Sequence, residues 1–518
     1  MHRIAGTLAF VVIIVVQAQC KTSPLDIGLP STDEWAAFNP ITSSCYPGNP
    51  FNSPDSCDAV AANWSLASFH AALPESCGSP LFVNNSCLPP GVVGYMENQG
   101  CDIGGMPQYV ASDRNIRIVI KDTTGNVLIT GSGNNYGRIL GAAMNAGRVV
   151  ISGNDPTVGP GGHIQGGGHG PLSSTYRLAA DQIYQMRVVT TQGEIPVADA
   201  TQNQDLLWAV RGGGAGQYGV VTESTKTYPA RAAVITASVV LSLVGNGTAA
   251  FNASWNALGA LASAIPGLID AGVGAGTIQG IAAKGVSISM GFTVFNTTVE
   301  ALRTIAAPVI ALMQTQAPYD SAFRAFLTEP TDRITSPSNT AGLPSFMSTR
   351  PLGQEQISDL PIPVVRSYFE RGTRKESGGI YVMVIGLQGG PGPRNVDPSM
   401  RGALLPSWRT TYLHTIGMAS ALYMTLSPQD TLNKAARWAE ENFKAVWREW
   451  APNTGSYMNE GNPMNSNFKK DSYGSSYDRL FEIKQKYDPT ESLYVLSGVG
   501  VMLGSTTLTL TSCVGSGE

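Results

Sequence analysis

Glycine and histidine gather in one stretch of the chain, residues 155–181, in a pattern that suits the binding of phosphate groups. Seven glycines lie between residues 155 and 170, together with His163 and His169. Glycine has no Cβ and tolerates positive φ, so backbone amides in such a run can approach a ligand closely and form a concave nest for anions. The alternative is a pair of ordinary loops without a ligand.

A second glycine cluster, RGGGAGQYG, follows at residues 211–219, and a strand is expected between the two clusters at 185–191. Two nests indicate a large cofactor with two phosphates. Gly214, Gly216 and Gly219 match the dinucleotide fingerprint GxGxxG, which should follow a strand and open a helix. Here the cluster follows DLLWAVR, which predicts a helix, and precedes VVTESTKTY, which predicts a strand. We therefore reject a nicotinamide-binding Rossmann unit.

These motifs carry a family resemblance. The segments PTVG, GGHIQGGGHGPLS and LAAD, followed by DLLWAVRGGGAGQYGVVT, resemble the flavin-binding half of the berberine-bridge-enzyme-like oxidases, and more narrowly their fungal secreted branch, often labelled isoamyl alcohol oxidases. The closing segments GSYMNE (455–460) and YGSSYDRLFEIKQKYDP (473–489) are similar to the end of that family. The resemblance runs from about residue 33 onward. It implies FAD as cofactor and the fold of the vanillyl-alcohol-oxidase/PCMH-type flavoproteins.

The resemblance also implies residues for the cofactor. His163 matches a family position beside the pyrimidine edge of the flavin, where positive charge would stabilise the reduced anion. The alternative is that His163 makes a hydrogen bond that stabilises its loop. Tyr457 and Asn459 match a Y-x-N segment that the family places against the flavin. The complete set of predicted FAD contacts is Pro156, Thr157, Val158, Gly159, Gly162, His163, Gly166, Gly167, Gly168, His169, Leu172, Asp181, Gly213, Gly214, Gly219, Val220, Tyr457 and Asn459.

The base that removes the substrate's proton is not identified by the sequence. Tyr381, Tyr412 and Tyr457 are the predicted catalytic residues, because they lie in segments that could face the flavin ring. A tyrosine with an ordinary pKa of about 10 needs nearby positive charge to act near neutral pH. His414 is a further candidate, although a packed helix histidine is the simpler interpretation.

The chain departs from the family where the flavin is usually tethered. The loop that carries the tether histidine, often N-T-G-H-D, corresponds to residues 121–126, which contain no histidine. The second tether, a cysteine before P-T-V-G, is replaced by Asp155. An arginine-rich turn and a neighbouring strand are missing as well. We therefore predict non-covalent FAD. Two explanations remain open: a gene model that lost an exon or a decaying paralogue, or a protein that works without the tether or without redox chemistry.

The predicted function is an FAD-dependent oxidase that passes a hydride from an alcohol or secondary-metabolite substrate to FAD and then to O2, giving H2O2. The cofactor would supply the redox chemistry and the protein its orientation. Two alternatives belong to other classes: a non-redox flavoprotein that templates a cyclisation or isomerisation, and a secreted binding protein without cofactor. An inactive paralogue is the remaining alternative.

Length and hydrophobic periodicity predict an α+β protein of several domains. A chain of 518 residues is too long for one core. Period-two patterns at 235–243 and 286–294 and an apolar run at 379–387 predict strands, and helices are expected at 255–265, 299–314 and 431–450. We predict a PCMH-type two-subdomain FAD-binding domain and an antiparallel-sheet substrate domain with helices on one face. The predicted boundaries are 1–20 signal peptide, 21–108 Cys-rich extension, 109–230 shortened FAD domain, 231–450 substrate domain and 451–518 return to the FAD domain.

The first twenty residues predict secretion. A basic start at Arg3 precedes an apolar run at 9–16, which is a signal-peptide pattern and too short to span a bilayer. If cleavage follows Cys20, six of the seven cysteines remain, an even number that suits disulfides. Five N-x-S/T sequons predict N-glycans at Asn63, Asn84, Asn246, Asn252 and Asn296. The net charge of −4 recommends neither nucleic acid nor an anionic membrane as partner, leaving a small-molecule substrate and O2.

Overall fold

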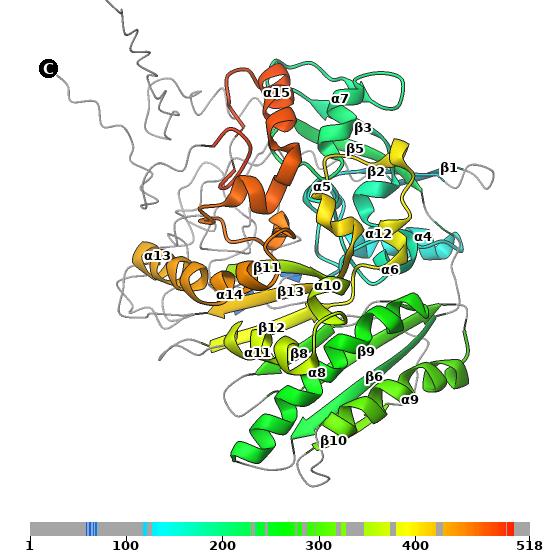
Figure 1. Cartoon of the computed structure of the whole chain (residues 1–518). Helices are drawn as coiled ribbons and strands as arrows, with labels where there is room; N and C mark the ends of the chain where they lie inside the picture. Colours follow the sequence, from blue (N-terminus) through cyan, green and yellow to red (C-terminus); the bar gives the residue numbers. More distant parts are fainter. Residues whose placement is uncertain are drawn as a thin grey trace, which may run out of the picture.

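The fold is built on two antiparallel sheets, one from each half of the chain (Figure 1). The computed structural model describes residues 59, 62–63, 66, 68–69, 118–121, 127–227, 229, 234–243, 247–274, 277–281, 286, 288–295, 297–316, 323–327, 346–372, 380–420, 428–493 and 495–501. The predicted signal peptide, the cysteines and the sequons Asn84, Asn246 and Asn296 therefore lie outside the described residues, as does most of the helix expected near residues 59–73.

The first sheet has five strands in the order β1-β2-β5-β3-β4. These are β1 (Ile118–Lys121), β2 (Val127–Gly131), β3 (Ile183–Val189), β4 (Val197–Ala198) and β5 (Val220–Thr227). Helices α4 (Tyr136–Asn145), α5 (Pro160–Gln165), α6 (Ser173–Tyr176) and α7 (Gln204–Val210) belong to this half. The strand expected at 148–151 is wrong: this segment joins no ladder beyond an isolated bridge at Arg148, and the amide of Val149 donates to the carbonyl of Pro229.

The second glycine cluster lies between α7 and β5, so it follows a helix and leads into a strand. This order confirms the rejection of a nicotinamide-type Rossmann unit. Positive φ angles at Gly212, Gly214, Gly216 and Gly219 explain why glycine is repeated there.

The second sheet has eight strands, and its main path is β10-β6-β9-β8-β12-β13-β11, with β7 paired to β9. The bounds are β6 (Val234–Leu243), β7 (Val273–Gly274), β8 (Thr277–Ile281), β9 (Ile288–Phe295), β10 (Phe323–Leu327), β11 (Phe346–Gly353), β12 (Ile380–Gly386) and β13 (Thr411–Ser420). All of its pairings are antiparallel. The three strands expected from periodicity correspond to β6, β9 and β12.

A layer of helices covers one face of this sheet, with α8 and α9 lying across β6 and β9 (Figure 1). The helices are α8 (Thr248–Asp270), α9 (Val299–Gln316), α10 (Gln354–Ile357), α11 (Ile362–Gly372), α13 (Pro428–Ala439) and α14 (Ala445–Trp450), the last two joined by a π-helical turn at Glu440–Lys444. Phe443, Trp447 and Trp450 are buried in the core beneath them, as the helical spacing predicts. The α+β class, with helices on one face of an antiparallel sheet, is confirmed.

The end of the chain returns to the first half of the molecule. Helix α15 (Tyr477–Tyr487) packs beside α7. Its residues Leu480 and Ile483 share one core with Leu206 and Val210. The short helix α12 (Pro391–Arg394) packs on α6, so a connection between β12 and β13 also meets the first half.

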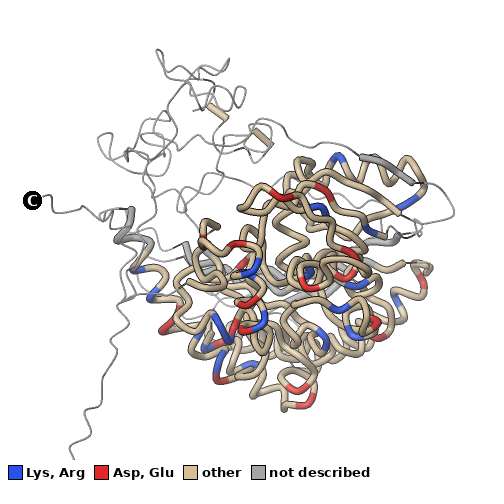
Figure 2. The backbone as a smooth tube through the Cα atoms, turned by 90° about the horizontal axis from the view of Figure 1, so that it is seen from above, with Lys and Arg blue, Asp and Glu red and all other residues tan. Residues whose placement is uncertain are grey.

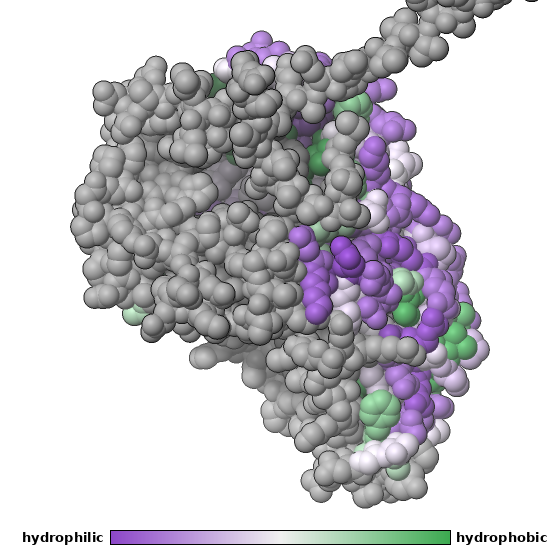
Figure 3. All heavy atoms as spheres, turned by 90° about the vertical axis from the view of Figure 1, so that its left-hand side faces the viewer, coloured by the Kyte–Doolittle hydropathy of each residue, from purple (hydrophilic) through white to green (hydrophobic). Residues whose placement is uncertain are grey.

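The surface of the described residues shows no segregation of charge. Figure 2 shows acidic and basic residues interspersed along the backbone. On the face in Figure 3 the described atoms are largely hydrophilic, with apolar residues scattered among them. Among the described residues, every helix is too short or too polar to cross a membrane.

Candidate active site

The two glycine clusters meet in space. The amide of Gly214 donates to the carbonyl of Gln165 at 2.9 Å, which joins the loop before β5 to the end of α5. The segment after Gly455 lies against the same place, since Nδ2 of Asn459 donates to the carbonyl of His163 at 3.3 Å. Two of the predicted FAD-binding stretches and the Y-x-N segment therefore form one site.

Close packing against the protein itself explains part of the first glycine run. A Cβ on Gly166 would lie 2.1 Å from the side chain of Asn459, and one on Gly167 would lie 2.6 Å from Leu404. A Cβ on Gly168 would lie 2.6 Å from Ala179. Glycine is required at these three positions whether or not a ligand binds.

Other glycines of the run face open space. Gly162 has no heavy atom within 4 Å of the place where a Cβ would stand, and Gly159 has only the carbonyl of Asn134, at 3.6 Å. Both belong to the first turn of α5 or its N-cap. Because the first amides of a helix have no intrahelical acceptor, this turn leaves donors and room for an anionic group.

His163 is half-buried and its two ring nitrogens are both used. Nδ1 lies 2.9 Å from the hydroxyl of Tyr136, and Nε2 lies 2.9 Å from the carbonyl of His169. Desolvation lowers the pKa of His163 to about 4. A neutral imidazole near pH 7 disfavours the predicted positive charge beside the flavin, and the two hydrogen bonds fit the alternative of a loop-stabilising role.

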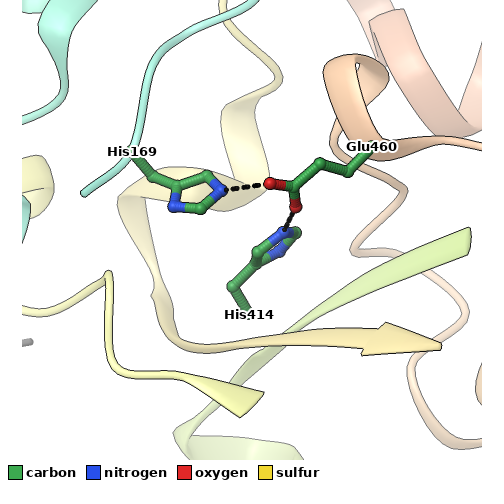
Figure 4. A group of neighbouring side chains, drawn as sticks. All are labelled: His169, His414 and Glu460. Carbon is green, nitrogen blue, oxygen red and sulfur yellow. Dashed lines mark hydrogen bonds and ion pairs between the residues drawn. The ribbon is translucent and has the colours of Figure 1, made fainter. Parts of the chain in front are cut away.

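His169, His414 and Glu460 form a compact cluster that draws on three separate segments (Figure 4). Nε2 of His169 lies 3.1 Å from Oε1 of Glu460, and Nε2 of His414 lies 2.7 Å from Oε2 of the same carboxylate. Burial alone would raise the pKa of Glu460, but the charge and hydrogen bond of His169 and the hydrogen bond of His414 hold it well below its usual range. Burial lowers the pKa of His414 more than Glu460 raises it.

The sequence analysis missed Glu460 and misplaced His414. His414 lies on strand β13, not on a helix, and is fully buried. Glu460 ends the recognised segment GSYMNE, but a single glutamate gives no signal of its own. In the folded chain β13 and the glycine loop come together, and Glu460 lies between their two histidines.

Two aromatic side chains flank this cluster. The ring of Trp408 stacks near His169 at a centroid distance of 6.0 Å, and the ring of Tyr457 lies edge-on to it at 4.8 Å. Both aromatic residues are buried. Burial, and next the charge of Glu460, raise the pKa of Tyr457, which disfavours the predicted role of this residue as a base near neutral pH.

The segment that carries Glu460 is fixed to the second sheet. The amide of Tyr457 donates to Oγ1 of Thr349 on β11 at 2.8 Å, and the hydroxyls of Thr349 and Ser456 lie 3.0 Å apart. Beneath them, Asp471 accepts hydrogen bonds from the guanidinium groups of Arg350 and Arg448. These contacts set the position of the Glu460 carboxylate.

Several predicted residues have other contacts. Asp181 forms a two-point ion pair with Arg409 and so joins the two halves of the molecule. The hydroxyl of Tyr412 donates to Asp270 at 2.8 Å and accepts from Arg394, and none of its hydrogen bonds reaches the histidine cluster. Tyr381 lies on β12 opposite Ala419, and its side chain is outside the described residues.

The remaining predicted cofactor contacts pack against other parts of the protein or lie on its surface. Leu172 is buried in the first core, and Gly213 lies against the carbonyl of Ala209. A Cβ on Gly219 would meet Val188 of β3, whereas Val220 is exposed. Pro156, Thr157 and Val158 form the turn before α5, in which Oδ1 of Asp155 accepts from the amide and hydroxyl of Thr157.

Known proteins similar to this chain are flavoproteins. The model described as berberine and berberine like matches residues 456–499. The chain is 26% identical to the FAD-linked oxidoreductase ZEB1 of Gibberella zeae, over 96% of this chain and 95% of that protein. It is 28% identical to the VAO-type flavoprotein oxidase VAO615 of Thermothelomyces thermophilus, over 93% of each. The crystal structure of the VAO-type flavoprotein MtVAO713 from Myceliophthora thermophila C1 superposes with a TM-score of 0.77 at 22% identity, over 93% of this chain and 97% of that chain.

Over almost its whole length the chain is similar to FAD-linked oxidoreductases and VAO-type flavoproteins, and its residues 456–499 match the berberine-like model. The family resemblance inferred from the glycine motifs is thereby confirmed. The alignment with ZEB1 spans 567 positions for a chain of 518 residues, so this flavoprotein carries gaps relative to that protein.

The described residues fit FAD on the side of its phosphates. The open first turn of α5 offers amides, whereas Gly214 joins the second glycine cluster to the last residue of this helix, Gln165. The Tyr457–Asn459 segment and the histidine cluster lie at that same end of α5. Asp155 stands where the resemblance implies the tether cysteine.

Proposed function

We propose that this protein is an FAD-dependent oxidase that binds FAD non-covalently and oxidises the CH–OH group of a small alcohol or secondary metabolite, with O2 as the final electron acceptor. Bound FAD would supply the acceptance of the hydride and its transfer to O2. The observation that carries the proposal is the junction at α5: Gly214 bonds the end of this helix, Asn459 bonds the carbonyl of His163, and the first turn is open.

In this proposal the chain's own residues have separate tasks. The first turn of α5 would hold the pyrophosphate through backbone amides. Tyr457 and Asn459 would support the ring, with Nδ2 of Asn459 donating to the Tyr457 hydroxyl at 2.7 Å. Trp408 and Tyr457 enclose the polar cluster and limit the access of water to it. Residues of the second sheet and its helices would determine which substrate binds.

The attachment of the cofactor is tested by the visible spectrum of the purified secreted protein before and after acid precipitation. We expect a flavin spectrum beforehand and a yellow supernatant afterwards, because no covalent link holds the cofactor. Non-covalent FAD occupies its site in proportion to [FAD]/Kd, so dilution should also lower the flavin content. A yellow pellet would show a covalent link and contradict this part of the proposal.

The position of the FAD site is tested by a matched pair of glycine substitutions. Gly162→Asp places a carboxylate in the open first turn of α5, where it would repel the pyrophosphate although acidic residues suit that end of a helix. Gly141→Asp is the control, because Gly141 is also exposed and unobstructed but lies on α4. We expect at least about 10-fold weaker FAD binding for G162D, which is about 1.4 kcal/mol, and little change for G141D. Equal FAD affinities in the two variants would place the phosphates elsewhere.

Gly167→Val is a poorer test of the same site. Gly167 has φ of +119°, and its Cβ would clash with Leu404. A valine there would strain the fold without reporting on a ligand.

Hydrogen peroxide formation with alcohols tests the reaction itself. Oxygen consumption with release of H2O2 supports the oxidase. Bound flavin that no alcohol reduces would favour the non-redox cyclase or isomerase alternative, and a colourless protein would favour a binding protein. The finer assignments to secretion and to the isoamyl alcohol oxidase-like branch are parts of this proposal that rest on the sequence.

A further inference from the structure

The cluster of His169, His414 and Glu460 contains two buried nitrogens without a hydrogen-bond partner. These are Nδ1 of His169 and Nδ1 of His414. The Nε2 atoms of both rings are directed at the single carboxylate of Glu460, and Figure 4 shows the second nitrogen of His169 on the side of the ring away from that carboxylate. Buried polar atoms in proteins almost always have a partner, so two such atoms in one cluster call for an explanation.

The protonation of Glu460 determines the tautomer of both rings. Its pKa lies below the usual range, so the carboxylate is ionised near neutral pH and can only accept hydrogen bonds. Both Nε2 atoms must therefore carry hydrogen. In a neutral imidazole the other nitrogen then holds a lone pair. Nδ1 of His169 and Nδ1 of His414 are thus two basic nitrogens, each held in this form by the same carboxylate.

The surroundings distinguish the two histidines. His414 is completely enclosed on β13, whereas the side chain of His169 is 13% exposed. His169 also follows Gly168 directly, at the end of the glycine run that borders the proposed FAD site. Trp408 and Tyr457 pack against the ring of His169. A proton donor bound at Nδ1 would therefore be shielded from bulk water. Of the two side chains, only that of His169 reaches the surface, with its Nδ1 buried behind that surface.

A metal ion is the competing occupant of this cluster. Two imidazole nitrogens and a carboxylate oxygen lie within 4.8 Å of one another, which is a possible ligand set. Metal-bound histidines nearly always donate their other N–H to an acceptor, which fixes the ring. Here both Nδ1 atoms lack any partner among the described residues, so this second layer of contacts is missing. The orphan nitrogens argue against a metal site made of Glu460 and the two Nε2 atoms.

We infer that His169 is the catalytic base of this site, with Nδ1 accepting the hydroxyl proton of the substrate, and that Glu460 and His414 position it. The inference rests on the proposed oxidase function. The O–H bond breaks and its proton passes to Nδ1 of His169, while the C–H bond breaks and its electron pair passes to oxidised flavin as the acceptor, leaving a carbonyl product. The imidazolium that forms stands 3.1 Å from Glu460, whose negative charge stabilises it.

Three variants separate these roles. His169→Gln removes the base and should lower the rate constant of flavin reduction by about 10²–10⁴-fold. Glu460→Gln keeps the shape but offers only one carbonyl oxygen, so at least one ring must adopt the other tautomer, and the rate should also fall by about 10²-fold or more. His414→Gln keeps an amide that can donate to Glu460, so its positioning role predicts a smaller loss of rate, of less than about 10-fold.

The kinetic measurement is anaerobic single-turnover reduction of the flavin in the full-length secreted protein, with benzyl alcohol and 3-methyl-1-butanol as probes. Reduction by dithionite is the control that the flavin itself is intact. If wild type is reduced and H169Q is reduced at the same rate, His169 is not the base although the oxidase proposal stands. If neither probe reduces the wild-type flavin, the oxidase proposal fails, and the tautomer measurement below still tests the cluster.

The second readout does not depend on activity. Protein labelled with ¹⁵N-histidine should show His169 and His414 as neutral rings protonated on Nε2, assigned by loss of signal in H169Q and H414Q. In E460Q at least one ring should switch to protonation on Nδ1. Rings protonated on Nδ1 in the wild type would overturn the inference. So would stoichiometric Zn²⁺ binding at sub-micromolar concentration that shifts both rings and is lost in E460Q, because the cluster would then be a metal site.

Discussion

At the scale of single residues, His163 should couple protonation to folding. Its pKa is about 4 in the folded protein because it is buried, against about 6.5 in an unfolded chain. The depressed pKa means that the full stability is present above about pH 6.5 and is lost as pH falls toward 4. The loss amounts to about 3 kcal/mol for this one group. His414 contributes in the same direction because its pKa is also lowered.

His163→Gln should therefore flatten the dependence of unfolding free energy on pH. We expect H163Q to be less stable than wild type at pH 7, because Tyr136 loses its ring partner. The difference between the two proteins should shrink toward pH 4.5. Urea unfolding at several pH values measures it, and parallel curves for the two proteins would contradict the assignment.

Lys226 has a buried amine with no hydrogen-bond partner among the residues that the structure describes. Its ammonium lies 5.5 Å from the ring centroid of Tyr136, and burial lowers the pKa of Lys226 to about 7. Because this pKa is depressed, the wild type loses stability as pH falls from about 10.5 toward 7. Lys226→Met should raise the free energy of unfolding by about 1–3 kcal/mol near pH 6.5, with a smaller gain at pH 9.5. Lys486→Met is the control, since its ion pair with Asp205 is largely exposed. A K226M variant less stable than wild type at pH 6.5 would reveal an anionic partner for this lysine.

At the scale of elements, one carboxylate joins strand β11, helix α14 and the segment after residue 468. Asp471 lies 3.0 Å from both Arg350 and Arg448 and 3.7 Å from Lys444. Burial alone would raise the pKa of Asp471, but the three cations lower it to about 2. Its contribution to stability is therefore complete above about pH 4 and is lost only as pH falls through 2.

Asp471→Asn removes the counter-charge that is paired with buried Arg350 and Lys444, whereas Arg448 keeps its ion pair with Glu440. We expect it to lower the free energy of unfolding by about 3–5 kcal/mol at pH 7. Glu449→Gln serves as comparison, because the Arg371–Glu449 pair is exposed and should contribute less than about 1 kcal/mol. The same D471N variant should move Glu460, since the amide of Ser456 donates to the carbonyl of Asp471. Denaturant unfolding measures both variants, and equal small effects would show that the buried network is not coupled to the fold.

At the scale of the whole molecule, the two halves are joined by contacts that the chain order does not suggest. Arg409 reaches Asp181 across the interface, α12 packs on α6, and α15 packs on α7. The domain boundaries given by the sequence remain predictions. The site lies where the halves meet, so its geometry depends on their assembly.

N-glycosylation during secretion should raise the apparent mass of the protein. The signal-peptide pattern and five sequons predict a secreted glycoprotein. Of the described sequons, Asn252 is exposed on α8, where its side-chain oxygen accepts from Arg366. Endoglycosidase treatment of secreted protein should lower its apparent mass, and replacing Asn252 with Gln should remove one glycan. An unchanged band would contradict the prediction.

The sequence by itself determined the features that depend on local pattern. Period-two runs and helical spacing gave β6, β9, β12, α8 and α9, because side-chain alternation follows from backbone geometry within each element. The glycine motifs gave the family, since their order along the chain is long and specific.

Only the tertiary structure decided the chemistry of the site. His163 loses its charge because of burial, which no neighbour in sequence reveals. Glu460 becomes central because β13 and the glycine loop bring His414 and His169 to it, from 46 and 291 residues away. The tyrosine bases remain predictions, and the sequence did not reveal their contacts: Tyr412 donates to Asp270, and Tyr457 is buried beside a carboxylate. Hydrogen-bond partners and solvent exposure arise from contacts across the fold, and these determine which residue can hold or release a proton.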